Sequence, residues 1–158
     1  MSEDARFEDG REAPLNLGAL DDEDLKVLSA LAQDAVFPVT EMTWRAKERR
    51  FAILLNRFRW EDAENAQARG RDVERVQSLL VIEHVTKIAS QGVDRKDADT
   101  IHAVLAIESS SEGDAHDVTL TLAGDGAIRL SVEALEVSLK DVTRPYLAPS
   151  RKTPDHGL

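Results

Sequence analysis

The residues best suited to chemistry in this chain lie close together, in one stretch that runs from Arg50 to Glu61. The stretch reads Arg-Phe-Ala-Ile-Leu-Leu-Asn-Arg-Phe-Arg-Trp-Glu and ends in an amide, two guanidinium groups, an indole and a carboxylate. A guanidinium beside an indole can hold an anion, because the cation pairs with it while the ring packs on the stem. We therefore expect a binding site here. Its candidate residues are Arg45, Asn56, Arg57, Arg59, Trp60 and Glu61.

An extended backbone decides which way these side chains point. Alternation places Phe51, Ile53 and Leu55 on one side of a strand, with the two arginines following on that same side. The opposite side also carries large apolar residues, so both faces need cover at the start of the strand. We expect the strand to begin buried and to end with one face basic and open to water.

Charge is unevenly distributed along the chain. The formal net charge is −10, yet residues 45–75 hold nine basic against six acidic side chains. One interpretation is that these arginines pair with the surplus carboxylates on a solvated face. The other is an anion-binding patch. The negative field of the whole chain repels phosphate and argues against nucleic acid as a partner.

Several kinds of chemistry are excluded or disfavoured by composition. The chain has no cysteine, which rules out disulfides, thiolate metal sites and cysteine nucleophiles. Its four histidines show no metal-ligand spacing, and no nucleotide-binding or nucleophile motif is present. We expect no metal and no cofactor, and we favour a protein that is not an enzyme.

Length and polarity indicate one domain. A chain of 158 residues that is 42% hydrophobic can bury a single core. We place one α+β domain at 15–146 and disordered tails at 1–14 and 147–158. The N-terminus lacks the apolar run of a signal peptide, and no stretch approaches about 18 uncharged apolar residues. We expect a cytoplasmic protein without a membrane segment.

Local patterns predict the elements of the first half. Four acidic residues, 21–24, precede an apolar stripe of helical spacing from Leu25 to Ala35, which predicts an amphipathic helix of about three turns with a carboxylate cap, ended by Pro38. Alternation predicts an antiparallel hairpin of 39–45 with 50–60. Residues 61–72 contain no large apolar side chain, and we interpret them as a solvent-exposed loop.

The second half is typical of strands. We predict one long strand over 73–89, another over 100–109, an exposed loop over 109–117, and a tight hairpin that turns at Gly124-Asp125-Gly126. Residues 133–142 fit either a short helix or a bulged strand, and we favour the strand.

The resulting fold class is α+β, with an N-terminal helix packed on a mainly antiparallel sheet of about six strands. Closure of the sheet like a pleckstrin-homology barrel is one form that such a sheet can take. The antiparallel assignment follows from the hairpins and from the lack of helices between the later strands.

Several short segments, above all Asn-Arg-Phe-x-Trp-Glu at 56–61, resemble an uncharacterised family of small bacterial proteins with a domain of unknown function. The other segments lie within 28–36, 50–52, 127–133 and 139–141. The resemblance covers about 15–146. It implies a cytoplasmic bacterial protein and carries no activity, cofactor or catalytic residue.

Three functions follow from these patterns. We favour a non-catalytic binding or protein-interaction module whose Arg/Trp patch takes a small anionic ligand or an acidic segment of an unknown protein. One alternative is a small hydrolase or isomerase, with Asp34, Asn56, Arg57 and Glu61 in a cleft. The other alternative is a homo-oligomer that buries Phe58 and Trp60 against a second copy.

Overall fold

A computed structural model of the chain describes residues 13–113 and 115–147. About 50% of the residues lie in strands and 17% in helices, and the strands form one mainly antiparallel sheet. The strands are β1 (Asn16–Ala19), β2 (Val36–Pro38), β3 (Met42–Arg45), β4 (Arg50–Phe58), β5 (Arg75–Ile82), β6 (Val85–Gln91), β7 (Ile101–Glu112), β8 (Ala115–Leu122), β9 (Ala127–Val132) and β10 (Val137–Asp141). The helices are α2 (Asp22–Ala32) and α3 (Ala63–Ala68), with 3-10 turns η1 (Val39–Glu41) and η2 (Trp60–Asp62).

The sheet is open and has ten strands. Its order is β1-β10-β5-β4-β2-β7-β8-β9-β6, and β3 pairs with β4 beside this path. Six strands and closure into a barrel are therefore wrong expectations. β1 and β2 contain only four and three residues, too few for alternation to show in the sequence.

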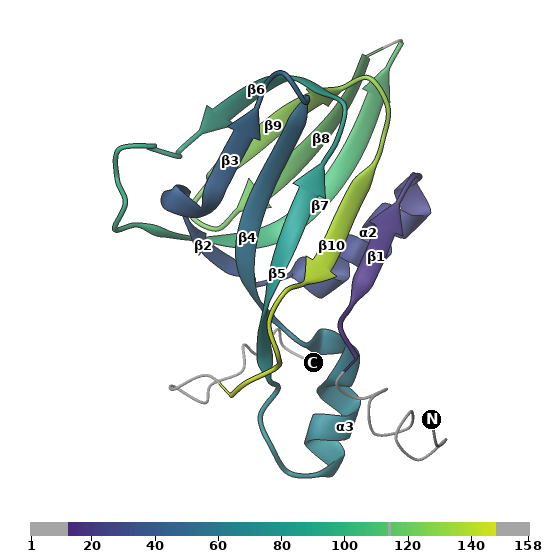
Figure 1. Ribbon diagram of the computed structural model, residues 1–158, viewed down its shortest axis with the longest axis vertical. Helices are drawn as coiled ribbons and strands as arrows, with labels where there is room; N and C mark the ends of the chain where they lie inside the picture. Colours follow the sequence, from purple (N-terminus) through teal and green to yellow (C-terminus); the bar gives the residue numbers. More distant parts are fainter. Residues whose placement is uncertain (1–12, 114, 148–158) are drawn as a thin grey trace.

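The open sheet curls until its two halves face each other. Figure 1 shows β8 and β9 lying behind β4 and β5, with α2 beside β1 and β10. The apolar side chains between the two halves form one core. It includes Phe51, Ile53, Leu80, Leu120 and Leu130, each no more than 2% exposed.

The expected helix is α2, and it follows strand β1 instead of opening the fold. Asp21 caps it, because its carboxylate accepts a hydrogen bond of 2.8 Å from the Asp24 amide. The apolar stripe of the helix faces the core, where Leu25 and Leu28 are buried. The helix has eleven residues, about three turns as expected, and it ends at Ala32 because Gln33 leaves the helical region of φ and ψ.

Both predicted hairpins are present. β3 pairs antiparallel with β4, and the second strand of that pair is the stretch that begins at Arg50. β8 pairs antiparallel with β9 around the glycine turn, in which Gly124 and Asp125 both adopt positive φ. Only a residue that tolerates the left-handed region fits such positions.

Two segments differ from the expected elements. The predicted long strand over 73–89 breaks at His84, which has a φ of 59°, and its halves β5 and β6 lie far apart in the sheet. The expected loop over 61–72 contains the end of η2, where Asp62 is buried, and helix α3, whose buried residue is Ala66. Side-chain bonds to Asp62 hold this helix, so it needs no large apolar anchor.

The remaining expectations meet mixed outcomes. The expected loop over 109–117 is mostly strand, because β7 runs to Glu112 and β8 starts at Ala115. Residues 137–141 are a strand, as favoured, although β10 pairs with β1 and β5 instead of continuing the preceding hairpin. The tails expected at 1–14 and 147–158 fall almost entirely outside the described residues. No helix in 13–113 or 115–147 is long and apolar enough to cross a membrane.

Candidate functional site

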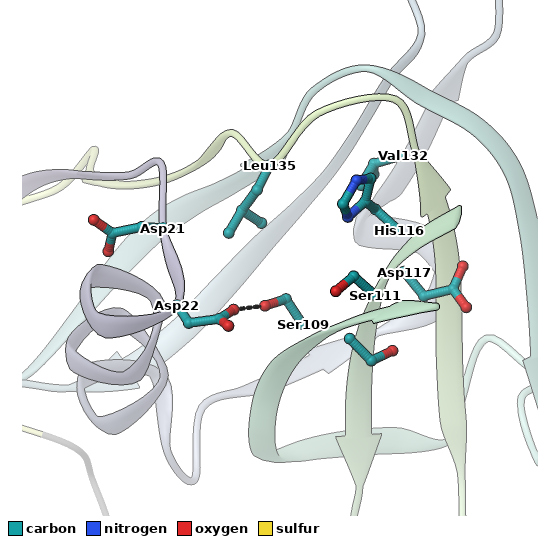
Figure 2. Close-up of a pocket in the computed structure, with 9 residues that line it drawn as sticks. Asp21, Asp22, Ser109, Ser111, His116, Asp117, Val132 and Leu135 are labelled. Atoms are coloured by element: carbon teal, nitrogen blue, oxygen red, sulfur yellow. Dashed lines mark hydrogen bonds between the residues drawn. The ribbon is translucent and has the colours of Figure 1, made fainter. Parts of the chain in front are cut away.

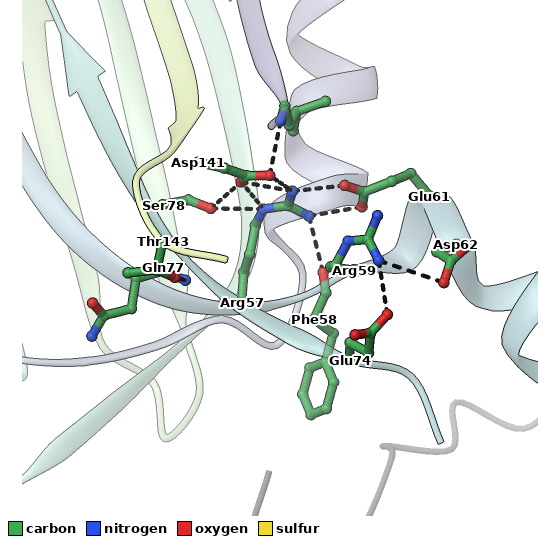
Figure 3. Close-up of polar contacts among 11 residues, drawn as sticks. Arg57, Phe58, Arg59, Glu61, Asp62, Glu74, Gln77, Ser78, Asp141 and Thr143 are labelled. Atoms are coloured by element: carbon green, nitrogen blue, oxygen red, sulfur yellow. Dashed lines mark hydrogen bonds and ion pairs between the residues drawn. The ribbon is translucent and has the colours of Figure 1, made fainter. Parts of the chain in front are cut away.

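Arg57, the centre of the predicted patch, lies inside the protein. Its side chain is 0% exposed, on the inner face of β4 after Phe51, Ile53 and Leu55. Figure 3 shows its guanidinium between two carboxylates. Glu61 receives two hydrogen bonds of 2.8 Å from Nη1 and Nη2, and Nη2 also binds Asp141 Oδ1 at 2.9 Å. A buried guanidinium held in this way is a structural group.

The partners of this arginine join distant parts of the chain. Ser78 on β5 accepts from Arg57 Nε at 2.8 Å and donates to Asp141 Oδ1 at 2.6 Å. The other carboxylate oxygen of Asp141 accepts the Leu15 amide at 2.8 Å. The cluster therefore ties together β4, β5, β10, the start of β1 and η2.

Burial alone would lower the pKa of Arg57. Hydrogen bonds and charge from Glu61 outweigh that cost, and with Asp141 they raise the pKa above its ordinary value. The guanidinium therefore stays charged at neutral pH. Its charge and its hydrogen bonds are already satisfied within the protein.

Arg59 belongs to a second cluster at the same end of β4. It is 5% exposed and donates to Glu74 at 2.9 Å, and its guanidinium lies 3.5 Å from Asp62. Arg71 reaches Asp62 at 2.7 Å. Burial would raise the pKa of Asp62, but hydrogen bonds from Arg71 and Asn65 hold it below its usual value.

The expectation of a wet basic face is therefore wrong. Both arginines at the end of the strand are buried, and four carboxylates from η2, β10 and the segment before β5 neutralise them. The prediction that Arg57 and Arg59 follow Phe51, Ile53 and Leu55 on the same side was correct. The incorrect step was the inference that a charged inner face must be open to water.

The other predicted residues do not join one site. Arg45 lies at the opposite end of the β3–β4 hairpin, opposite Arg50, in an exposed ion pair with Glu48. Trp60 donates its indole N–H to the Gln33 carbonyl at 2.8 Å. Phe58 is 3% exposed, so it is already buried without the second copy that the oligomer interpretation supplied.

The proposed hydrolase or isomerase cleft is not formed. Asn56 points to the outer face of β4, whereas Arg57 and Glu61 meet on the inner side. Asp34 lies in the turn after α2, where its amide binds the Val104 carbonyl. The sheet therefore separates Asn56 from Arg57 and Glu61.

The outer face of the sheet over β4, β5, β2 and β7 is apolar. Register places pairs such as Ala52 with Val81 and Leu54 with Leu79 side by side on it. All members are at least partly exposed, and Ile101 and Leu105 are 58% and 43% exposed. The aliphatic members of this surface, which we call the outer apolar face, are Val36, Pro38, Ala52, Leu54, Leu79, Val81, Ile101, Ala103 and Leu105.

A cavity of about 230 Å³ opens in this face beside β4. It forms because β3 pairs with β4 only from Ile53 back toward the turn, and β2 meets β4 at Asn56. The edge of β4 between these two contacts therefore lacks a strand beside it. The walls are mostly aliphatic, and the polar lining residues are Glu41, Asn56 and Gln77.

The Asn56 side chain is the unusual member of this cavity. Its Oδ1 atom is buried and accepts no hydrogen bond from any described residue. An acceptor left in this state costs about 1 to 3 kcal/mol relative to one that is satisfied. A binding site explains such a group, because a ligand can supply the missing donor.

A second cavity, of about 280 Å³, lies at the N-terminus of α2. In Figure 2, Asp22 is hydrogen bonded to Ser109 across it, and Ser111 and His116 line the side formed by the β7–β8 hairpin. Ser111 is directly opposite His116 in the register. No hydrogen bond joins these two side chains among the described residues, so the pair lacks the contact that activates a serine.

These features differ in how visible they are in the sequence. The second cavity depends on Ser109 and His116, which the sequence shows only as a polar segment and a scattered histidine. The outer apolar face was visible in part, because both sides of β4 carry apolar residues. The described residues contain no group of three or more His, Cys, Asp or Glu side chains placed to hold a metal ion.

The fold and the side-chain geometry define an open, curled antiparallel-sheet protein whose buried arginines are internal ion pairs. The family model described as "Protein of unknown function (DUF2948)" matches residues 15–156, and the chain belongs to this family. Membership of an uncharacterised family is therefore confirmed. Its bacterial origin and the diagnostic value of the 56–61 motif stay predictions. No curated protein and no solved structure matches the chain.

Proposed function

We propose that the protein is a non-catalytic interaction module that docks another protein on its outer apolar face. The observation that carries this proposal is an aliphatic surface across four adjacent strands, partly exposed on β2, β4 and β5 and most exposed on β7. Ile101 and Leu105 are its most exposed members. A contiguous apolar surface of this kind is typical of a protein-binding site.

The half of the sheet formed by β8, β9 and β6 provides a comparison for the polarity of the outer apolar face. On β8, β9 and β6 the outward residues are mainly polar, as in the row Thr119, Arg129 and Ala89 and in the pair Ser131 and Lys87. The inward residues of these strands are apolar. That half has the ordinary pattern of a sheet with one dry and one wet face. The apolar outward residues of the first half are therefore a local property.

A different protein fits this face better than a second copy does. Each copy carries a net charge of −10, so two copies repel each other as they approach. The same charge attracts a basic partner and favours its association. The proposed occupant is an aliphatic segment that carries positive charge.

Site-specific photocrosslinking tests this proposal. A photoreactive amino acid is placed at Leu79 in the outer apolar face, and a matched one at Thr119 on the outward side of β8. The proteins are expressed and irradiated in their native cells. We expect a discrete adduct with another protein from position 79 and none from position 119.

The captured protein is then purified and its Kd is measured against the wild-type chain and the double variant Ile101→Ser, Leu105→Ser. Weaker binding by at least tenfold, with an unchanged melting temperature, supports the proposal. Equal adducts from both positions, or no adduct from either, contradict it. An adduct with a second copy or with the chain's own terminal segments also contradicts it, because those occupants differ from the one proposed.

A further inference from the structure

We infer that the cavity beside β4 receives the side chain of a lysine or arginine from the docked partner. This inference rests on the proposed function and adds the chemistry by which the partner is recognised. The lining residues, the unsatisfied acceptor and the local charge each support it independently.

The walls of the cavity fit a methylene stem. Leu54, Pro38 and Ile101 line it together with Val36 and Phe37, and their side chains offer only hydrocarbon to an occupant. Lysine and arginine bury their aliphatic stems along such surfaces while the charged head stays with polar groups. A short acidic side chain has no comparable stem to place there.

The polar groups of the cavity are acceptors for a cationic head. Asn56 Oδ1 is buried with no hydrogen-bond partner among the described residues, and Glu41 contributes a carboxylate to the same lining. An ammonium or guanidinium group supplies a donor to the first and a countercharge to the second. A neutral aliphatic side chain would leave the Asn56 acceptor unsatisfied.

Two neighbouring cations, Arg75 and Lys140, do not line the cavity. The guanidinium of Arg75 lies 4.4 Å above the Phe58 ring and is held there. Lys140 is on β10, with β5 between it and β4. Among the residues that line the cavity, Glu41 is the one acidic or basic residue.

A titration with small probes tests the recognition of the side chain without the partner. The probe is n-butylguanidinium, and its neutral counterpart n-butylurea has the same shape without the charge. Nuclear magnetic resonance follows the Asn56 side-chain amide and the backbone amides of β2, β4 and β7. We expect saturable shifts with the cation, and weaker binding of the urea by about tenfold or more.

Two variants remove the two recognition groups separately. Asn56→Leu replaces the unsatisfied acceptor by a side chain of similar volume, and Glu41→Gln removes the charge. Each should weaken cation binding several-fold with no fall in melting temperature. Glu108→Gln removes a similar exposed carboxylate on the outward side of β7, away from the cavity, and should leave binding unchanged.

Equal binding of the two probes, or unchanged cation binding in Asn56→Leu and Glu41→Gln, overturns the inference. The crosslink from position 79 separates this failure from failure of the docking proposal. If the Glu41→Gln variant still forms the adduct from position 79, and the captured partner binds that variant with an unchanged Kd, the partner docks without a basic side chain in the cavity. The conclusion is the same if the double variant Ile101→Ser, Leu105→Ser loses the adduct while Asn56→Leu and Glu41→Gln keep it.

Discussion

Asn56 and Arg57 are neighbours on β4, and they show two opposite ways in which a polar side chain is buried. Arg57 points inward, is 0% exposed and donates to Ser78, Glu61 and Asp141. Asn56 lies on the outward side of β4 and lines a cavity, and its buried oxygen accepts no hydrogen bond within the described chain. The first group is satisfied by the fold, whereas the second lacks a partner that the fold could have supplied.

This difference between Arg57 and Asn56 indicates that a binding function lies on the outward side of β4. The sequence predicted an anion site because guanidinium groups bind anions. In the structure, the anions that Arg57 and Arg59 bind are the protein's own carboxylates. An amide is a weaker signal. Its unmet acceptor, set in an apolar surface, is nevertheless the feature that a partner can complete.

The largest expected effect comes from breaking the inner cluster. Arg57→Leu leaves Asp141 and Glu61 without their cation, and we expect a loss of about 3 to 5 kcal/mol in the free energy of unfolding. Urea denaturation measures it. Arg45→Ala is the matched control, because its ion pair with Glu48 is exposed, and it should change stability little. A similar, small loss in both variants would contradict the structural role of Arg57.

The next effect compares the two faces of β5. Leu80 is 0% exposed in the core, and Leu80→Ala should cost about 2 to 5 kcal/mol of unfolding free energy. Its neighbour Leu79 lies on the outer apolar face, and Leu79→Ala should cost about 1 kcal/mol or less. Chemical denaturation of the two variants checks this. Equal losses would mean that the outer face is covered in the free protein.

A smaller effect depends on pH. The pKa of Asp62 is lower in the folded protein than in the unfolded chain, so ionised Asp62 stabilises the fold above about pH 4. This stabilisation is lost as the pH falls through the folded pKa. Asp62→Asn should therefore be less stable than the wild type at pH 7, with a gap that narrows toward pH 3. Thermal melts across this range give the gap, and a constant gap would contradict the charge-based account.

The smallest effect on stability is expected for a substitution of Asn56, the outward neighbour of Arg57. Asn56→Leu removes an unsatisfied acceptor, so its stability should be equal to the wild type or higher by up to about 1 kcal/mol, with no dependence on pH. Calorimetry at pH 5 and pH 7 provides the comparison. Marked destabilisation would show that Asn56 serves the fold.

The sequence predicted those parts of the fold that depend on neighbouring residues. The acidic cap of α2, the glycine turn between β8 and β9, and the alternation of β4 are all local, and all three are present. The break at His84 was missed because a run of β-branched residues continues through it. Nothing local shows that the two halves of such a run belong to distant strands.

The site was harder to predict because its meaning depends on contacts between distant residues. Asp141 is 84 positions away from Arg57 and Ser78 is 21 away, so the sequence could not show that they neutralise the arginine. The cavity beside Asn56 exists because two short strands meet β4 at different points. That arrangement is a property of the register.

The pairing of β1 with β10 sets the order in which the chain can complete itself during synthesis. β1 occupies residues 16–19 and meets only β10, at residues 137–141, in the sheet order. A ribosome has therefore made most of the chain before the first strand gains its neighbour. Until then the edge of β1 is unpaired, and the Leu15 amide lacks the Asp141 carboxylate that later binds it. Premature termination just before residue 137 would leave β1 with nothing to pair with, and such fragments are expected to be prone to aggregation and degradation.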